Sequence, residues 1–143
     1  MTLEQILDQW AKDSAIDRTE VGIASSNNAQ LHSKYIKILA QERVKLVAIE
    51  AQYKQQYKDA FELYTNGASS EHAKQGRIIP QHIIVKKDAE LYVESDPIVI
   101  QAKIKLAIQQ EKISTLLEIV RMINNRSYQI RGIIDWEKFK AGL

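Results

Sequence analysis

Apolar side chains recur at intervals of three and four residues along most of this chain, which is the spacing of one helical face. Residues 2–13 show it first, and Thr2 and Gln5 there have the spacing of a capping box. A longer helical pattern follows to about residue 66, where a glycine supplies a stop. The polar run 25–28 offers an alternative kink or break in that helix. The pattern therefore predicts a short helix followed by a long one.

A second long helical pattern begins at Asp96, which is suited to an N-cap, and Pro97, which is suited to the first helical position. It runs to about residue 125, and a further short apolar helix is expected from about residue 133. The long pattern is apolar on more than one face, so neighbouring elements must bury it. One stripe contains Val99, Ala102, Leu106, Ile113, Leu116, Val120 and Ile123, and the other contains Ile100, Ile104, Ala107 and Ile108.

Between the long helices, residues 80–97 alternate apolar and polar side chains, which is the period of a β-strand. The chain's two prolines bracket this segment, and residues 87–89 provide a turn. The pattern predicts a β-hairpin whose two faces are both partly apolar. Such a hairpin is marginal in water by itself, so it must pack on helices or on other copies of the chain.

We therefore expect a mainly α fold with one β-hairpin (α+β), in which long helices assemble into a homo-oligomeric ring. A monomeric bundle that buries both stripes of the last long helix remains an alternative. One domain, 1–143, is expected: residues 1–66 helical and basic from residue 34, residues 67–95 a loop and the hairpin, and residues 96–143 a helical oligomerisation part. The predicted oligomerisation residues are Ile84, Leu91, Val93, Leu106, Ile113, Leu116, Val120, Ile134, Trp136 and Phe139.

The net charge of +2 neither marks nor excludes a nucleic-acid binder, but the charges are segregated along the chain. Residues 1–33 carry two basic and five acidic side chains, whereas residues 34–58 carry six basic and two acidic ones. In residues 53–64 lysines alternate with tyrosines, a mixture that binds single strands through phosphates and stacked bases. Alternatively, the tyrosines belong to the core and the lysines to its wet edge. The candidate DNA-binding residues are Lys34, Lys37, Arg43, Lys54, Tyr57 and Lys58, with Lys86 and Lys87 at the expected hairpin tip.

Catalytic chemistry finds little support in the sequence. There is no cysteine, the three histidines are scattered, and the five glycines form no phosphate-binding loop. We therefore predict a protein that is not an enzyme and that needs no metal or other cofactor. The lack of cysteine fits a reducing interior. No secretory signal or membrane-length apolar run is visible, so a cytoplasmic protein without membrane contact is expected.

Three stretches carry a family resemblance: KDSAIDRT at 12–19, NNAQLHSKYI at 27–36 and RSYQIRGIIDWEKFKAG at 126–142. Together with LEQIL near the start and IEAQ near the middle, they resemble the UvsY family of phage recombination mediators over essentially the whole chain. The resemblance implies a non-enzymatic accessory protein of homologous recombination in the cytoplasm of an infected bacterium. Such proteins form homo-oligomeric rings, bind single-stranded DNA and help the phage recombinase UvsX to replace the phage single-strand-binding protein.

The resemblance also implies a DNA-binding segment with the family pattern of Lys-x-Arg followed by Asp and Tyr. Lys58 matches the lysine, Glu62 stands for the aspartate, and Tyr64 for the tyrosine, which adds Tyr64 to the candidate DNA-binding residues. Ala60 occupies the arginine position and removes a charge, for which Lys54, Lys34 and Lys37 are candidates to compensate. The competing hypothesis is a helical oligomeric adaptor or structural protein that acts through protein contacts without binding DNA.

Overall fold

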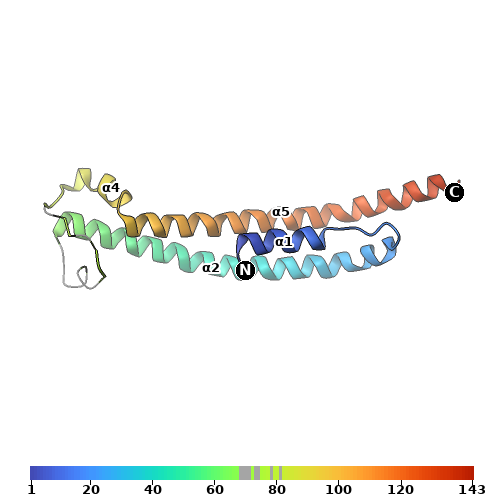
Figure 1. Cartoon of the computed structure of the whole chain (residues 1–143), viewed down its shortest axis with the longest axis horizontal. Helices are drawn as coiled ribbons and strands as arrows, with labels where there is room; N and C mark the ends of the chain where they lie inside the picture. Colours follow the sequence, from blue (N-terminus) through green and yellow to red (C-terminus); the bar gives the residue numbers. More distant parts are fainter. Residues whose placement is uncertain (68–71, 73–74, 78, 81) are drawn as a thin grey trace. The chain divides into compact units, whose positions relative to one another are not determined.

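The computed structural model describes residues 1–67, 72, 75–77, 79–80 and 82–143. All regular elements within those residues are helices (Figure 1), and they are α1 (Leu3–Asp13), α2 (Val21–Asn66), α4 (Lys86–Glu94) and α5 (Pro97–Lys140). The expected mainly helical character is present. The expected β-hairpin is not, so the α+β fold class was wrong.

In the described part of the segment predicted as a hairpin, a short irregular stretch precedes a helix. Residues 83–85 belong to no helix or strand, and only Val85 is shown in an extended conformation. The backbone N–H of Ile84 donates to the carbonyl oxygen of Tyr64 at 2.7 Å. The expected turn at 87–89 lies inside α4. Ala89 and Val93, one helical turn apart, are both fully buried, so their burial has the helical period. The alternation read from the sequence was too short to distinguish the two periods.

The start of the chain follows its local signals closely. Thr2 and Gln5 form the predicted capping box, with the Gln5 N–H donating to Thr2 Oγ1 at 3.1 Å and the Thr2 N–H donating to Gln5 Oε1 at 2.8 Å. The polar run 25–28 does not break α2. Asn28 Nδ2 donates to the carbonyl oxygen of Ile123 at 3.3 Å, so its side chain bonds to α5 and leaves the helix intact.

The second long helix starts where predicted but ends later. The Asp96 carboxylate accepts hydrogen bonds from the N–H groups of Ile98 at 2.9 Å and Val99 at 3.3 Å, as an N-cap does. The helix α5 then continues to Lys140, so the expected end near residue 125 was wrong. Arg126 and Ile130 are both buried, which extends the inward-facing positions past that point.

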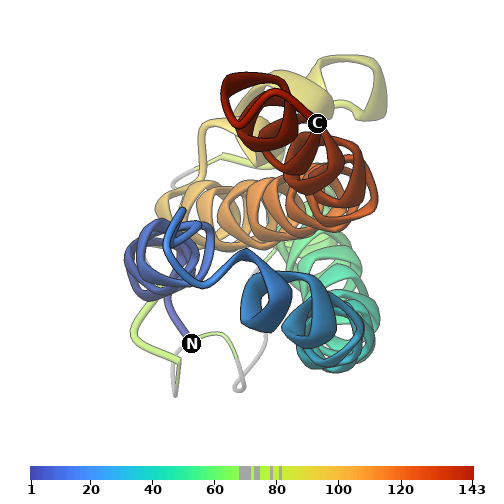
Figure 2. The ribbon, with the colours of Figure 1, turned by 90° about the vertical axis from the view of Figure 1, so that its right-hand side faces the viewer.

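The chain divides into two compact units, and the boundaries fall inside α2 and α5. Unit 1 consists of residues 1–44 and 110–143, and unit 2 consists of residues 45–109. In unit 1, α1 lies alongside parts of α2 and α5 (Figures 1 and 2). Its core contains Ile6, Tyr35, Leu39, Leu116, Ile119 and Ile123.

Unit 2 has a smaller apolar core and a buried polar network. The core joins α2, α4 and α5 through Ala60, Val93 and Val99, and four aromatic side chains pack against it. Beside it Arg77 Nη1 lies 3.2 Å from both carboxylate oxygens of Asp96, and both side chains are almost fully buried. This network connects Arg77 to the start of α5.

Candidate nucleic-acid interface

Lys54 and Lys58 form an exposed basic pair on α2 in unit 2. They lie one helical turn apart, so their ammonium groups extend from neighbouring positions on the helix. Lys58 Nζ lies 3.9 Å from Glu62 Oε1, and its side chain is 78% exposed. An ion pair with this exposure contributes little to stability, so a phosphate group can compete with the carboxylate. The pair is therefore a candidate for contact with two neighbouring phosphates.

The tyrosines between these lysines serve the core of unit 2. Tyr53 and Tyr57 are partly buried against the cluster that contains Ala60, and their ring centroids are 6.2 Å apart. Burial raises the pKa of Tyr57, and the negative charges of Glu90 and Glu94 raise it further. This geometry favours the alternative in which the tyrosines belong to the core and the lysines lie at its solvent-exposed edge.

Tyr64, which the family resemblance added, is also held by unit 2. Its hydroxyl donates to Asp96 Oδ2 at 2.9 Å, and its ring centroid lies 6.1 Å from that of Tyr92. Burial, together with the hydrogen bond and negative charge of Asp96, raises the pKa of Tyr64 from 10.0 to about 12. The hydroxyl stays protonated at neutral pH and supports the Asp96 cap.

Ala60, at the position where the family resemblance implies an arginine, is a core residue of unit 2. Its side chain is fully buried in the unit 2 core with Val93 and Val99. An arginine there would place an uncompensated charge among apolar side chains. The core of unit 2 therefore disfavours a charge at residue 60, and the exposed side of α2 is basic through Lys54 and Lys58.

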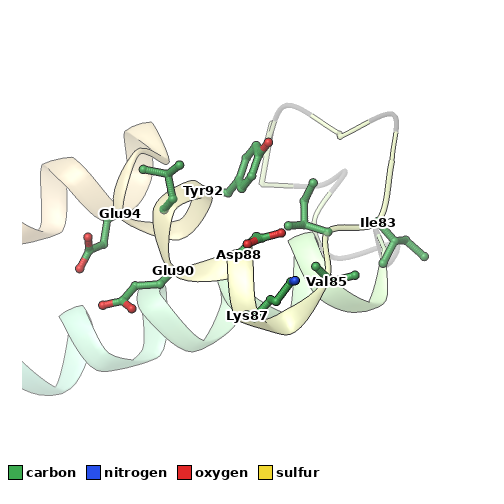
Figure 3. Close-up of a pocket in the computed structure, with 9 residues that line it drawn as sticks. Ile83, Val85, Lys87, Asp88, Glu90, Tyr92 and Glu94 are labelled. Carbon is green, nitrogen blue, oxygen red and sulfur yellow. The ribbon is translucent and has the colours of Figure 1, made fainter.

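Lys86 and Lys87 lie in the first turn of α4 and are both exposed. The segment 83–94 surrounds a groove of about 660 Å³, lined by apolar side chains, Lys87 and three carboxylates. Glu90 and Glu94 project to one side of α4, and Ile83 and Val85 lie on the other (Figure 3). Carboxylates repel phosphates, so α4 offers a weaker site for DNA than its two lysines suggest.

The remaining basic candidates belong to unit 1. Lys34 Nζ lies 2.6 Å from Asp13 Oδ2 and 5.6 Å from the centroid of the Tyr35 ring, so its charge is already engaged within the unit. Lys37 and Arg43 are exposed on α2. Lys37 and Arg43, unlike Lys34, are therefore placed to contact an external ligand.

The residues predicted for oligomerisation divide into three groups by burial. Val93 and Leu116 are fully buried inside their own chain, so they contribute to its core. Partly buried are Ile84, Leu106, Ile113 and Val120. Exposed are Leu91, Ile134, Trp136 and Phe139, of which Trp136 and Phe139 stack on each other with centroids 5.5 Å apart. The exposed group remains available to another copy.

Sequence reasoning missed the buried network of unit 2. Arg77 Nη2 lies 3.7 Å from Asp59 Oδ2, and His72 Nε2 lies 3.3 Å from the other oxygen of that carboxylate. The N-cap signal identified Asp96, but its ionic partner is 19 residues away and gives no local pattern. Within the described ranges there is no cluster of three possible metal ligands, and no helix is long and apolar enough to cross a membrane.

Comparison with known proteins gives concordant results. The family model described as "Recombination, repair and ssDNA binding protein UvsY" matches residues 9–143. The recombination protein uvsY of Enterobacteria phage T4 is 23% identical over 142 residues, which is 99% of each chain. Two crystal structures of the bacteriophage T4 recombination mediator protein UvsY, of lattice types IV and II, both have TM-scores of 0.81 with this chain. The first is 21% identical and covers 98% of this chain and 99% of its own, and the second is 24% identical and covers 99% and 98%. These likenesses show the fold.

Proposed function

Since this chain belongs to the UvsY family of recombination, repair and single-stranded-DNA-binding proteins, we propose that it is a recombination mediator that binds single-stranded DNA and acts by binding rather than by catalysis. The observation that carries this proposal is the family match over residues 9–143. The exposed pair Lys54 and Lys58 supports it, because the pair supplies the positive charge that a phosphate backbone requires.

The proposed binding mode is contact with the phosphate backbone, independent of base sequence. Lysine ammonium groups on an exposed helix neutralise phosphates without reading base edges. Lys54 and Lys58 make the central contacts, and Lys37 and Arg43 are additional candidates on α2. Since Tyr57 and Tyr64 are engaged in the core of unit 2, stacking of bases on these rings contributes less than the phosphate contacts.

The proposed role in recombination follows the family and the bacteriophage T4 relative, which is described as a recombination mediator protein. Several copies of this chain hold one strand in a shape that does not suit the phage single-strand-binding protein. This lowers the barrier for the phage recombinase, UvsX, to load onto the covered DNA. The site of action is the cytoplasm of the infected bacterial host.

The first test is a calorimetric titration of the purified chain with a single-stranded oligonucleotide over a salt series. Phosphate contacts release counterions, so log affinity should fall linearly with log salt, with a slope of about −0.7 per phosphate on single strands. Two oligonucleotides of the same length and different sequence should bind alike. A chain that binds no DNA at low salt would instead support the adaptor hypothesis.

The second test replaces the basic pair. Lys54→Ala combined with Lys58→Ala should weaken binding and make the salt slope shallower by about 0.7 for each phosphate that is no longer neutralised. The matched control is Lys103→Ala combined with Lys138→Ala, which removes the same charge from two exposed positions on α5. If control and test variants lose the same affinity, the effect comes from net charge and Lys54 and Lys58 are not the site.

A further inference from the structure

The groove around α4 exposes apolar side chains beside negative charge. It has a volume of about 660 Å³ and lies within unit 2. Ile83, Val85 and Leu91 line it and are 66%, 57% and 70% exposed. Apolar side chains that gather at a concave surface mark a contact with another molecule, whereas singly scattered ones do not. The DNA-binding role proposed above gives this surface no function.

The charges of α4 are arranged unfavourably for the chain by itself. Glu90 and Glu94 lie one helical turn apart, and like charges at this spacing destabilise a helix. Glu94 is also the last residue of α4, where the helix macrodipole favours a cation and where no basic residue stands. Within the described part of the chain, none of the groove's three carboxylates forms an ion pair. A cation from outside the chain would relieve both costs.

The charge of the groove decides between its possible occupants. Its described lining has three carboxylates and Lys87, so a DNA strand is repelled. A wholly apolar segment would cover the carboxylates without giving them a partner. Among the described residues, these carboxylates belong to no group of three that could hold a metal ion. The occupant therefore carries apolar side chains and cations together.

The spacing of the groove residues fits a helix. Glu90 and Glu94 are four residues apart, about 6 Å along the axis of α4. Lysines or arginines four residues apart on a partner helix have the same spacing. Figure 3 shows the two glutamates on one side of α4, with Ile83 and Val85 on the other. A helix that is apolar on one face and basic along one edge meets both sides at once.

We propose that this groove is a docking site for a protein partner that presents an amphipathic helix with lysines or arginines along one edge of its apolar face. The helix packs apolar side chains against Ile83, Val85 and Leu91, and its cations pair with Glu90 and Glu94. Such a ligand is opposite in charge to DNA. Electrostatic complementarity therefore directs the two ligands to different surfaces of unit 2. The docking does not require DNA and goes beyond the proposed function.

The first test measures binding of two synthetic peptides to the purified full chain by fluorescence anisotropy. One peptide is a helix with leucines on one face and lysines along its edges, and the other has the same leucines with glutamates in place of the lysines. The leucine-lysine peptide should bind, and its affinity should fall as salt is added, because the ion pairs lie at an exposed edge. The proposal is overturned if this peptide does not bind or if both peptides bind equally.

A pair of charge variants locates the basic edge of the contact. Glu90→Gln combined with Glu94→Gln keeps the side-chain size and removes two exposed ion pairs with the peptide, so binding should weaken about 10-fold. The matched control is Glu4→Gln combined with Asp8→Asn, which removes the same charge from two exposed positions one turn apart on α1. Equal losses in both variants would mean that the peptide follows net charge, which overturns the proposal.

A second pair of variants locates the apolar part of the contact. Leu91→Ser should weaken binding of the leucine-lysine peptide about 10-fold, because it removes apolar surface that the peptide covers. Leu7→Ser, which changes an exposed leucine on α1, should bind the peptide as wild type does. Both leucines are exposed, so both variants should retain their helix content by circular dichroism. Wild-type affinity in Leu91→Ser would overturn the proposal.

Two further measurements distinguish this occupant from others. In hydrogen exchange, the leucine-lysine peptide should slow the exchange of amides in residues 83–94, and protection confined to other segments would contradict the assigned site. In sedimentation velocity without peptide, Leu91→Ser should behave as wild type. A change in its sedimentation would mean that another copy of the chain covers the groove, and this result would also overturn the proposal.

Discussion

Unit 1 buries six large apolar side chains in one cluster, whereas the cluster of unit 2, counted over the residues that the structure describes, has three members, one of them an alanine. Each unit also buries an arginine. Arg77 in unit 2 meets the carboxylate of Asp96 at 3.2 Å, with that of Asp59 at 3.7 Å. Arg126 in unit 1 donates to the carbonyl oxygens of Ala15 at 3.0 Å and Ala24 at 3.4 Å, and to the side-chain oxygen of Asn28 at 3.4 Å.

The comparison shows two ways of stabilising a small helical unit. Apolar burial in unit 1 is non-directional and tolerates an arginine that reaches only neutral oxygens. In unit 2 the ion pair is directional, and it compensates for a small core only while both partners are present. Loss of one partner should therefore cost more in unit 2 than loss of the arginine costs in unit 1.

The largest effect is expected for Arg77→Met in unit 2. It leaves Asp96 buried without its cation, and breaking a buried pair costs about 3–5 kcal/mol. Urea unfolding followed by circular dichroism would measure the loss, and hydrogen exchange would show whether amides of unit 2 open first. A cost below about 1 kcal/mol would mean that the pair adds nothing beyond apolar packing.

Leu116→Ala tests the apolar core of unit 1. The side chain is fully buried, so its truncation removes apolar contacts and leaves a cavity at a cost of about 3 kcal/mol. The same urea experiment measures it, with Leu117→Ala on the exposed side of α5 as a matched control. Equal losses for the two leucines would contradict the assignment of Leu116 to the core.

Arg126→Met gives the direct comparison with Arg77→Met. It breaks hydrogen bonds to neutral oxygens and leaves no carboxylate without its partner, so a cost of about 1–2 kcal/mol is expected. The difference in unfolding free energy between the two arginine variants measures what the carboxylates contribute. A larger loss of unfolding free energy for Arg126→Met than for Arg77→Met would contradict the conclusion that unit 2 depends more strongly on its buried arginine.

Tyr64→Phe should have the smallest effect and a distinct pH dependence. It removes one hydrogen bond to Asp96, at a cost of about 1 kcal/mol near neutral pH. Because folding raises the pKa of Tyr64 to about 12, its stabilising contribution is complete below pH 10.0 and is lost as the pH rises through about 12. The difference in stability between wild type and Tyr64→Phe should therefore shrink over that window. A difference that is constant with pH would contradict the shift.

Local signals in the sequence predicted those parts of the fold that local chemistry decides. The capping box at Thr2, the stop after Asn66 and the N-cap at Asp96 each depend on residues within one turn. The β-hairpin predicted for the region of α4 was wrong, because a short alternating run does not distinguish the period of a strand from that of a helix. Ala89 and Val93 are buried one helical turn apart, which agrees with a helix.

For the candidate site, the sequence predicted which residue types would bind DNA, but it did not predict which of their side chains are exposed to a ligand. Lys54 and Lys34 are equivalent in the sequence, yet the Lys34 ammonium group donates a hydrogen bond to Asp13, which is 21 residues away. Ala60 looks like a lost charge and is a core position. Such distinctions depend on contacts between distant segments, which no spacing rule encodes. Only the fold shows which lysines can meet a phosphate.

The placement of the two tryptophans has a spectroscopic consequence. Trp10 meets the Tyr35 ring edge-on at 5.5 Å in the core of unit 1, whereas Trp136, 53% exposed, lies on α5 beside Phe139. Residues 45–109 contain no tryptophan. Tryptophan fluorescence therefore reports the unfolding of unit 1 and does not report the unfolding of unit 2. A blue shift without any change in ellipticity would then report that Trp136 has been covered by another molecule.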